Sequence, residues 1–285
     1  MSKWNLIIDV AECHNCHNCM VAAKDEFVGN AVAGYTEPHS AEGPAVIRIE
    51  RYVRGQGHHV DAAYLPRLCN HCDDAPCVKV GQGAVRKRDD GIVVFDPVAC
   101  RGRSDLVDAC PYGAVVWNEE RQLPQTWFFD AHLLDAGWHE PRCVTVCPTR
   151  ALQAVKIDDE AMAARAGNEG LRPLRPELGT RPRVYYRNLA RVDTVFVAAS
   201  VVRQTAAGAE CVEGAAVELS RDGQRVAHAL TDAFGDFRLD GLVPSSGPHE
   251  LRIRHPVHGD GRFVVELAAS SRVLGDLALG GAQRL

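Results

Sequence analysis

Eight of the eleven cysteines of this chain fall into two sets of four, and no other feature of the sequence constrains the fold as strongly. In each set, three cysteines lie close together and a fourth, which is followed by a proline, lies far along the chain. Each set therefore closes a long loop of polypeptide if its members share one centre. The first set is Cys13, Cys16, Cys19 and Cys147, and the second is Cys69, Cys72, Cys77 and Cys110.

The spacing within each set favours a four-iron cube over a single metal ion. Closely spaced thiolates force the loop to curl around one object, so that its amide groups point at sulfur. In iron–sulfur proteins three such cysteines hold one cube, and the cysteine before a proline reaches across from a distant run. We therefore predict two [4Fe-4S] clusters, one on each set. The alternative is a structural zinc site, although zinc more often lies between two separated Cys-x-x-Cys pairs.

Composition limits where the protein works. The chain has 285 residues, enough for one large or two ordinary domains. Cysteines at metal-ligand spacing, in a chain of this size, favour a reducing compartment over a disulfide framework. The N-terminal residues lack a signal-peptide core, and the sequence has no run of about 18 apolar residues. We therefore expect a cytoplasmic protein that does not span a membrane.

The charge balance does not favour a nucleic-acid partner. The formal net charge is −5, whereas nucleic-acid binders usually carry a basic face. Four arginines do cluster, but Glu177 and Asp193 flank them, and we interpret them as a solvated or subunit-facing surface. These arginines are Arg181, Arg183, Arg187 and Arg191.

The chain divides into three parts. Residues 1–157 hold ten of the eleven cysteines in a pattern of short strands, tight loops and short helices. Residues 158–196 open with a helix and continue as a proline-rich connector that we expect to wrap over a neighbouring surface. In residues 197–285, short alternating strands predict a small β-sandwich, with a hairpin around residues 221–224. The predicted fold class is α+β, with a ferredoxin-like double-cluster domain before an all-β sandwich.

The remaining candidate residues receive simpler interpretations. Cys211 is expected in the core of the sandwich. His58 and His59 lie in a glycine-rich stretch and are interpreted as an exposed turn, with metal ligation as the alternative. The sequence offers no Ser/His/Asp arrangement, phosphate loop or acid–base pair of carboxylates, so we expect no catalytic centre. We expect loop-filling roles for His14, His17 and His71, with tuning of cluster potential as the alternative, and core positions for Trp117, Trp127 and Trp138.

Residues 1–157 resemble the four-cluster electron-transfer subunit of the dimethyl sulfoxide reductase family of molybdenum enzymes. In that family sixteen cysteines in four runs hold four cubes, and ten of these positions are still cysteine here. The resemblance implies that two cubes are intact and that the second and fourth are lost, because one lost site keeps only Cys100 and the other only Cys143. The six missing ligands fall at Ala23, Gly81, Arg103, Leu106, Trp127 and Asp130.

A resemblance to one branch of this family extends over the whole chain, through segments such as IDVAECHNCHNCMVAAKDE, RPELGTRPRVYYRNL and TDAFGDFRLDGL. The branch contains the small subunits of pyrogallol–phloroglucinol transhydroxylases and anaerobic resorcinol hydroxylases, which carry a C-terminal immunoglobulin-like or transthyretin-like domain. The resemblance implies a large partner subunit that holds molybdenum between two pyranopterin guanine dinucleotides and acts on polyhydroxylated benzene rings. A third cube of the branch uses positions 23, 127 and 130, so this chain departs from its relatives there.

The sequence therefore predicts a non-catalytic iron–sulfur subunit of a molybdopterin-dependent hydroxylase or transhydroxylase. Two alternatives stay open. In one, the cubes only stabilise the fold and the heterodimer, which fits an electron path without its second and fourth stations. In the other, the chain is a free-standing ferredoxin-type carrier.

Overall fold

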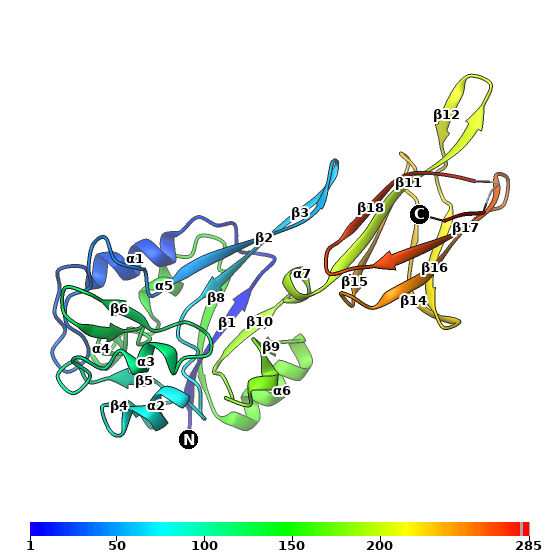
Figure 1. Ribbon diagram of the computed structural model, residues 1–285. Helices are drawn as coiled ribbons and strands as arrows, with labels where there is room; N and C mark the ends of the chain where they lie inside the picture. Colours follow the sequence, from blue (N-terminus) through cyan, green and yellow to red (C-terminus); the bar gives the residue numbers. More distant parts are fainter. Residues whose placement is uncertain (280–281, 285) are drawn as a thin grey trace. The chain divides into compact units, whose positions relative to one another are not determined.

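The computed structural model describes residues 1–279 and 282–284, and the chain divides into two compact units (Figure 1). Unit 1 comprises residues 1–51 and 64–189, and unit 2 comprises residues 52–63 and 190–285. Within the described ranges, no helix combines the length and the apolar character needed to cross a membrane.

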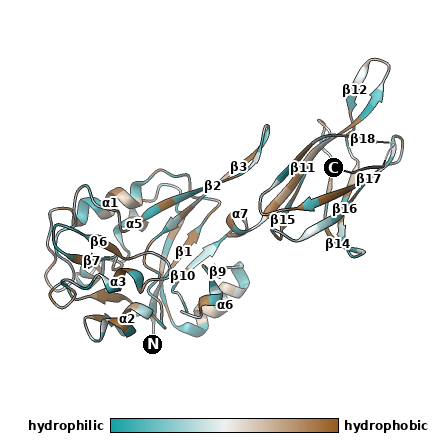
Figure 2. Cartoon of the chain, viewed as in Figure 1, coloured by the Kyte–Doolittle hydropathy of each residue, from teal (hydrophilic) through white to brown (hydrophobic). Residues whose placement is uncertain are grey.

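A largely buried strand, β1 (Lys3–Asp9), organises unit 1. It pairs antiparallel with β8 (Leu152–Ile157) on one side and parallel with β10 (Val184–Arg187) on the other. β9 (Arg172–Pro173) completes a four-stranded sheet in the order β8-β1-β10-β9. The apolar side chains of β1 give this strand its brown colour in Figure 2, as expected for a strand with neighbours on both faces.

Short elements surround this sheet. The helices of unit 1 are α1 (Asn18–Phe27), α2 (Pro76–Gly81), α3 (Asp105–Asp108), α4 (Ala131–Asp135), α5 (Arg142–Thr145), α6 (Asp159–Glu169) and the 3-10 helix η1 (Pro176–Leu178). The hairpins are β2 (Arg48–Gln56) with β3 (His59–Arg67), β4 (Val85–Lys87) with β5 (Val93–Phe95), and β6 (Val116–Asn118) with β7 (Leu123–Gln125). The tip of the β2–β3 hairpin, residues 52–63, belongs to unit 2.

The helix predicted after residue 158 is confirmed as α6. Asp158 caps its first turn by accepting a hydrogen bond from the backbone N–H of Ala161 at 2.8 Å, and Gly170 ends it in the left-handed conformation (φ 62°). The rest of the expected connector over residues 158–196 is divided between the two units. Residues up to 189 belong to unit 1, because β10 adds to the central sheet and buries Val184 and Tyr186.

The interpretation of the four arginines as a solvated surface is wrong for Arg183. This side chain is only 4% exposed and binds Asp73 through two nitrogens, with the Nε–Oδ1 distance at 2.7 Å. It also pairs with Asp159 at 2.8 Å and donates to the side chain of Asn5 at 3.2 Å. The positive charge is therefore used inside unit 1, where it ties β10 to β1, α6 and the second cysteine run.

Unit 2 is sandwich-like, with two main sheets that enclose an apolar core. Val197, Leu219, Leu251 and Phe263 are among its buried side chains. The predicted hairpin is confirmed, since Arg221 pairs with Gln224 around Asp222 and Gly223. The short helix α7 (Ala190–Asp193) precedes the sheets. The first sheet contains β11 (Val195–Thr205), β12 (Gly208–Cys211), β15 (Asp236–Leu242) and β18 (Arg272–Ala278). The second sheet contains β13 (Ala216–Arg221), β14 (Gln224–Leu230), β16 (Gly247–His255), β17 (Gly259–Leu267) and β19 (Ala282–Arg284).

The expectation that Cys211 lies in the core of the sandwich is wrong. Cys211 ends β12, whose four residues are all exposed, because β12 is an edge strand that pairs only with the far end of β11 in the described sheet. The small side chain gave no sign of this position, since edge and core strands share the same alternating pattern.

Candidate iron–sulfur sites

The central sheet of unit 1 brings the first cysteine run back to its distant partner. β1 leads into this run, and β8 begins shortly after Cys147. Because the two strands are antiparallel and Ile8 pairs with Leu152, the end of β1 lies beside the start of β8. The thiol of Cys19 accordingly interacts electrostatically with those of Cys13, Cys16 and Cys147.

The second set of cysteines gathers in a buried cluster of its own. Cys77 lies in α2, and Cys110 follows α3, which packs beside α2. The thiol of Cys69 interacts electrostatically with those of Cys72, Cys77 and Cys110. The structure thus places the eight cysteines in the two groups that their spacing predicts, and their role as iron ligands stays a prediction.

Residues in the left-handed backbone conformation allow both cysteine runs to curl. Asn15 and His17 have φ angles of 58° and 62°, and His71 has a φ angle of 45°. Side chains other than glycine adopt this conformation rarely, and Asn and His are among those that tolerate it best. The curl directs backbone N–H groups at sulfur: the amide of Asn15 bonds to the thiol of Cys13, and that of His71 to the thiol of Cys69.

A cube and a single zinc ion would space these thiols differently. A zinc ion with Zn–S bonds of about 2.3 Å would hold its sulfurs roughly 3.8 Å apart, whereas a cube binds each thiolate to a different iron. Among the described residues, the set of three His, Cys, Asp or Glu side chains whose donor atoms all lie within 4.8 Å of one another contains no cysteine.

The thiols need a positive centre to ionise. Burial and the neighbouring thiols raise the pKa of Cys19 and of Cys77 to about 12, and burial raises the pKa of Cys72 to about 11. Metal binding requires thiolates, so iron would have to displace these protons. Two side chains that the sequence did not single out assist at the second group. Thr180 donates a hydrogen bond to the Cys72 thiol, and Lys87 donates to the Cys72 carbonyl at 2.9 Å.

Trp127 and Asp130 lie at positions where the family resemblance implies ligands of a further cube. Trp127 is fully buried, and its indole N–H donates to Oδ1 of Asp130 at 3.1 Å. The backbone N–H of Arg142 donates to Oδ2 of Asp130 at 2.8 Å. Both carboxylate oxygens therefore have protein donors. The buried thiol of Cys143 lies next to this carboxylate and also interacts electrostatically with the thiols of Cys19 and Cys147.

Apolar side chains close the other position that lacks its cysteines. Leu106 and Val85 are buried, and the thiol of Cys100 donates to the carbonyl of Ala84 at 3.3 Å. A Cβ added at Gly81 would lie 2.8 Å from Cβ of Val85 and 2.9 Å from its Cγ2. The backbone at position 81 therefore lies closer to Val85 than a residue with a Cβ allows, so a cysteine does not fit there without a shift.

Gly81→Ala should therefore destabilise the protein, although alanine is normally the better helix residue. We expect a loss of about 1–3 kcal/mol in the free energy of unfolding, because overpacking forces the backbone of α2 away from Val85. Gly167→Ala, in α6, is the matched control, since a Cβ there would meet no atom within 4 Å. It should stabilise the helix by about 0.5–1 kcal/mol. Denaturant unfolding of the full chain measures both, and equal effects would contradict the closed site.

The histidines beside the cysteines differ from one another. His71 is completely buried, and its Nδ1 accepts the N–H of Val93 at 3.1 Å, so its proton lies on Nε2. Burial lowers the pKa of His71 to about 3. Its ring also packs against Trp127 and Phe129, so it does more than fill a short loop. His14 is exposed, whereas His17 is half-buried. Trp127 is buried as expected, whereas the core position expected for Trp138 is wrong, since this residue is 46% exposed.

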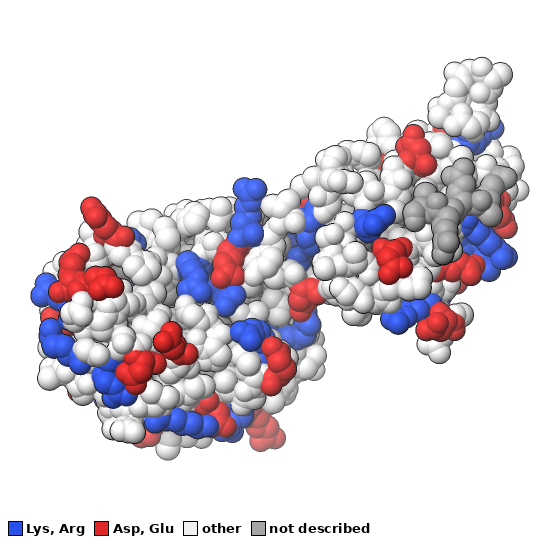
Figure 3. All heavy atoms as spheres, in the orientation of Figure 1, with Lys and Arg blue, Asp and Glu red and all other residues white. Residues whose placement is uncertain are grey.

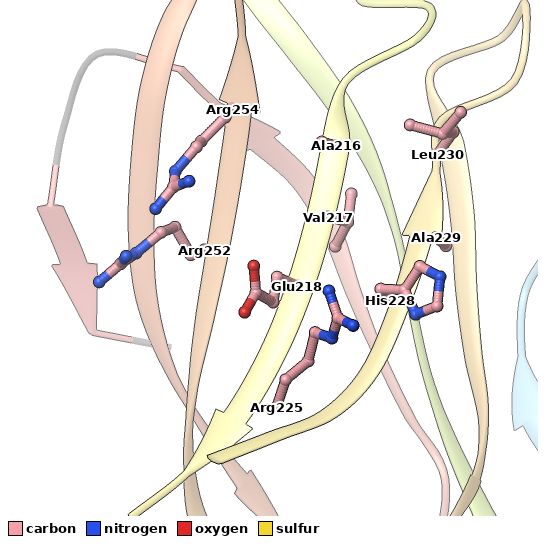
Figure 4. A pocket seen from close by; sticks show the side chains of 9 residues that line it. All are labelled: Ala216, Val217, Glu218, Arg225, His228, Ala229, Leu230, Arg252 and Arg254. Atoms are coloured by element: carbon pink, nitrogen blue, oxygen red, sulfur yellow. The ribbon is translucent and has the colours of Figure 1, made fainter. Parts of the chain in front are cut away.

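One pocket lies on β13, β14 and β16 and has a volume of about 480 Å³. Figure 4 shows Glu218 between Arg252 and Arg225, and Arg254 and His228 also line this pocket, so basic side chains predominate there. On the face of the molecule shown in Figure 3, acidic and basic side chains are interspersed and form no continuous basic stripe.

Comparison with known proteins gives similarities over both units. A model of the 4Fe-4S dicluster domain matches residues 60–157. The pyrogallol hydroxytransferase small subunit of Pelobacter acidigallici is 42% identical over 245 residues, which are 85% of this chain and 88% of that protein. A tetrathionate reductase subunit of Salmonella typhimurium is 34% identical over 202 residues, 68% of this chain and 75% of that protein. One polypeptide of the anaerobic dimethyl sulfoxide reductase of Escherichia coli is 34% identical over 167 residues, 55% of this chain and 76% of that polypeptide.

Proposed function

This protein belongs to the iron–sulfur subunits of the dimethyl sulfoxide reductase family of molybdenum enzymes, and on that premise we propose that it serves a hydroxylase or transhydroxylase of polyhydroxylated aromatic compounds. It is the small, non-catalytic subunit, and a large partner subunit with a molybdenum bis-pyranopterin guanine dinucleotide carries out the chemistry. The 42% identity to the pyrogallol hydroxytransferase small subunit supports this substrate class, because the similarity covers 85% of the chain. We expect the complex in the cytoplasm.

Two [4Fe-4S] clusters are the cofactors of the proposal. Cys13, Cys16, Cys19 and Cys147 hold one, and Cys69, Cys72, Cys77 and Cys110 hold the other. The observation that carries the proposal is a contrast within unit 1. Eight thiols converge in two groups with backbone N–H groups directed at sulfur, while Trp127, Asp130 and Gly81 lie at positions where the resemblance implies further ligands and are packed against protein atoms. The clusters supply one-electron transfer, and the surrounding residues set their potentials through burial, amide hydrogen bonds and charge.

The finer fold assignment supports the same function. We assign unit 1 to the ferredoxin-like double-cluster architecture, and the sandwich from residue 197 onward to the immunoglobulin-like or transthyretin-like domains of the branch. A C-terminal domain of this kind distinguishes the branch from ordinary electron-transfer subunits. The proposal therefore places this chain with the phenol-converting members of the family.

A structural role for the clusters is the second candidate. The two retained cubes would be the first and third stations of the family's electron path, so the step between them is long. Lys87 bears on this candidate, because it bonds to the carbonyls of His71 and Cys72 and to Asp73, and so holds the second run in place. A transhydroxylase moves a hydroxyl group without net oxidation, so it needs no long electron path.

Purification of the native complex tests the proposed function. We expect the full chain, isolated without oxygen, to retain one large subunit that contains molybdenum. We expect about eight iron and eight sulfide per small subunit, four of each from either cube. A small subunit that purifies alone, stable and monodisperse, would contradict the proposal and favour a free-standing carrier.

Reduction of the complex separates electron transfer from a structural role. Dithionite should bleach the visible absorption of both cubes in either case. If the cubes carry electrons in turnover, the aromatic substrate together with the large subunit should also bleach part of this band. If substrate never changes the band although the complex turns over, the clusters stabilise the fold and do not take part in the reaction.

A further inference from the structure

We propose that unit 2 carries a binding site for a divalent transition-metal ion, formed by His58, His59 and Asp236. This site is separate from the cysteines and goes beyond the proposed function. The donor atoms of the three side chains all lie within 4.8 Å of one another. Nε2 of His58 is 3.9 Å from Oδ2 of Asp236, and Nε2 of His59 is 3.9 Å from Oδ1. Two imidazoles and one carboxylate thus point at one place from residues far apart in sequence.

A glycine allows the histidines to reach the sandwich. Gly55 lies in the hairpin tip and has a φ angle of 79°. A Cβ at this position would lie 2.0 Å from the carbonyl oxygen of His59 and 2.5 Å from the ring of Phe196 on β11. The hairpin tip therefore lies against β11 only because residue 55 has no side chain. In this position the side chain of His59 is 11% exposed, whereas that of His58 is 64% exposed.

An ionic cluster anchors the tip of the hairpin. Arg54 is buried and pairs with Asp61 at 2.6 Å and with Asp240 on β15 at 3.1 Å. Arg238, beside Asp240, also reaches Asp61 and lies over the ring of Phe196, with its guanidinium carbon 4.0 Å from the ring centroid. The two histidines are therefore held on a fixed support, which lowers the entropy lost when a ligand binds.

Asp236 is oriented by its own neighbours. The hydroxyl of Ser200 donates to Oδ1 of Asp236, and Oδ1 of Asp232 accepts the backbone N–H of Asp236 at 2.9 Å. Hydrogen bonds of this kind fix the orientation of metal-binding carboxylates and tune their affinity. Asp232 also adds a negative charge that acts on His59, which favours a bound cation.

Contacts among the described residues leave the Nε2 atoms of His58 and His59 free to bind a ligand. At 3.9 Å, neither histidine is close enough to Asp236 for a hydrogen bond. Nε2 of His59 is buried and finds no hydrogen-bond partner among the residues that the structure describes. Arg238 is positive and acts on His59, and Asp61 and Asp240, which also pair with Arg54, offset part of its charge.

The donor set suits zinc or another divalent ion of the first transition row. Zn²⁺ binds imidazole nitrogen and carboxylate oxygen at about 2.0–2.2 Å, so tetrahedral ligand atoms lie about 3.3 Å apart. The two separations of 3.9 Å would have to close by only about half an ångström, which small side-chain rotations achieve. Because His58 is exposed, water can complete the coordination. The ion would pin the hairpin tip to β15.

Equilibrium dialysis of the full chain against Zn²⁺, without oxygen and with its iron in place, tests this site. We expect one Zn²⁺ per molecule in addition to any bound to thiols. His58→Ala removes an exposed side chain and should lower the zinc affinity at least about tenfold, as should Asp236→Asn. A matched control is the double variant His255→Ala/His258→Ala. These two rings also stack in unit 2, with centroids 4.4 Å apart, but belong to no such triad, so their loss should leave zinc binding unchanged.

Zinc X-ray absorption provides a second readout that does not depend on the variants. The proposal predicts nitrogen and oxygen neighbours at about 2.0–2.2 Å. Sulfur neighbours at about 2.3 Å would place the zinc on cysteines and overturn the site. Equal affinity in the wild-type chain and in His58→Ala would overturn it as well.

Discussion

Cys147→Ala will remove about half of the iron and sulfide of this chain, which should fall from about eight of each to about four. Cys147 is the distant member of the first group, and its thiol lies beside those of Cys13 and Cys19. Without it, one iron corner has no protein ligand and the cube is lost. The second group lies in a separate buried cluster and keeps its own cube. Iron and sulfide analysis of protein isolated without oxygen measures the loss.

A neighbouring cysteine provides the matched control for this experiment. Cys143→Ala removes another buried cysteine of the same segment, whose thiol lies beside Asp130 and near Cys19 and Cys147 but belongs to neither predicted group of four. Iron content should stay at about eight. The pair Cys110→Ala and Cys100→Ala repeats the comparison at the second group. An iron loss that is equal in Cys143→Ala and Cys147→Ala would mean that the cluster ligands are assigned wrongly.

Arg183→Ala should lower the free energy of unfolding by about 3 kcal/mol or more, since breaking a buried ion pair leaves its partners without compensation. Asp73 loses both of its bonds to the guanidinium, and Asp159 loses one. The backbone N–H of Arg183 also bonds to Asn70 at 2.9 Å, directly beside Cys69. The second cysteine run should therefore loosen with β10, and its cube should be released faster on denaturation.

Arg181→Ala separates this effect from a general loss of charge. The side chain of Arg181 is 69% exposed and lies 3.7 Å from Asp74, so its removal should leave stability without a measurable change. Denaturant midpoints of the two variants, followed by cluster absorption, measure the difference. Equal midpoints would show that the buried network around Arg183 contributes little to stability.

Much of unit 1, and one hairpin of unit 2, could be predicted because the residues that indicate them are close together in the sequence. The three-cysteine runs and the two Cys-Pro positions indicate two groups of four, and the structure gathers them in that way. β1, α6 and the β13–β14 hairpin follow from apolar alternation, from the cap at Asp158 and from the Asp222–Gly223 turn. Each of these signals depends on residues that are close together in the sequence.

The remaining features depend on pairs of residues that lie far apart. In the sequence, Arg183 cannot be distinguished from three neighbouring arginines. Only the pairing of β10 with β1 shows that its side chain contacts Asn5 and Asp73 inside unit 1. The proposed metal site joins His58 and His59 to Asp236 through the hairpin tip, whose place in unit 2 no local pattern indicates. Cys211 looked like a core residue because an edge strand and a core strand alternate alike.

The central claim is that two groups of four thiolates each bind one four-iron cube and that the chain holds no others. Mössbauer spectroscopy of the isotopically enriched full chain, combined with an elemental count, tests it most directly. We predict tetranuclear iron signals alone, with about eight iron atoms per chain. Zinc in place of iron, or an iron count near about twelve with a third cube, would contradict the account.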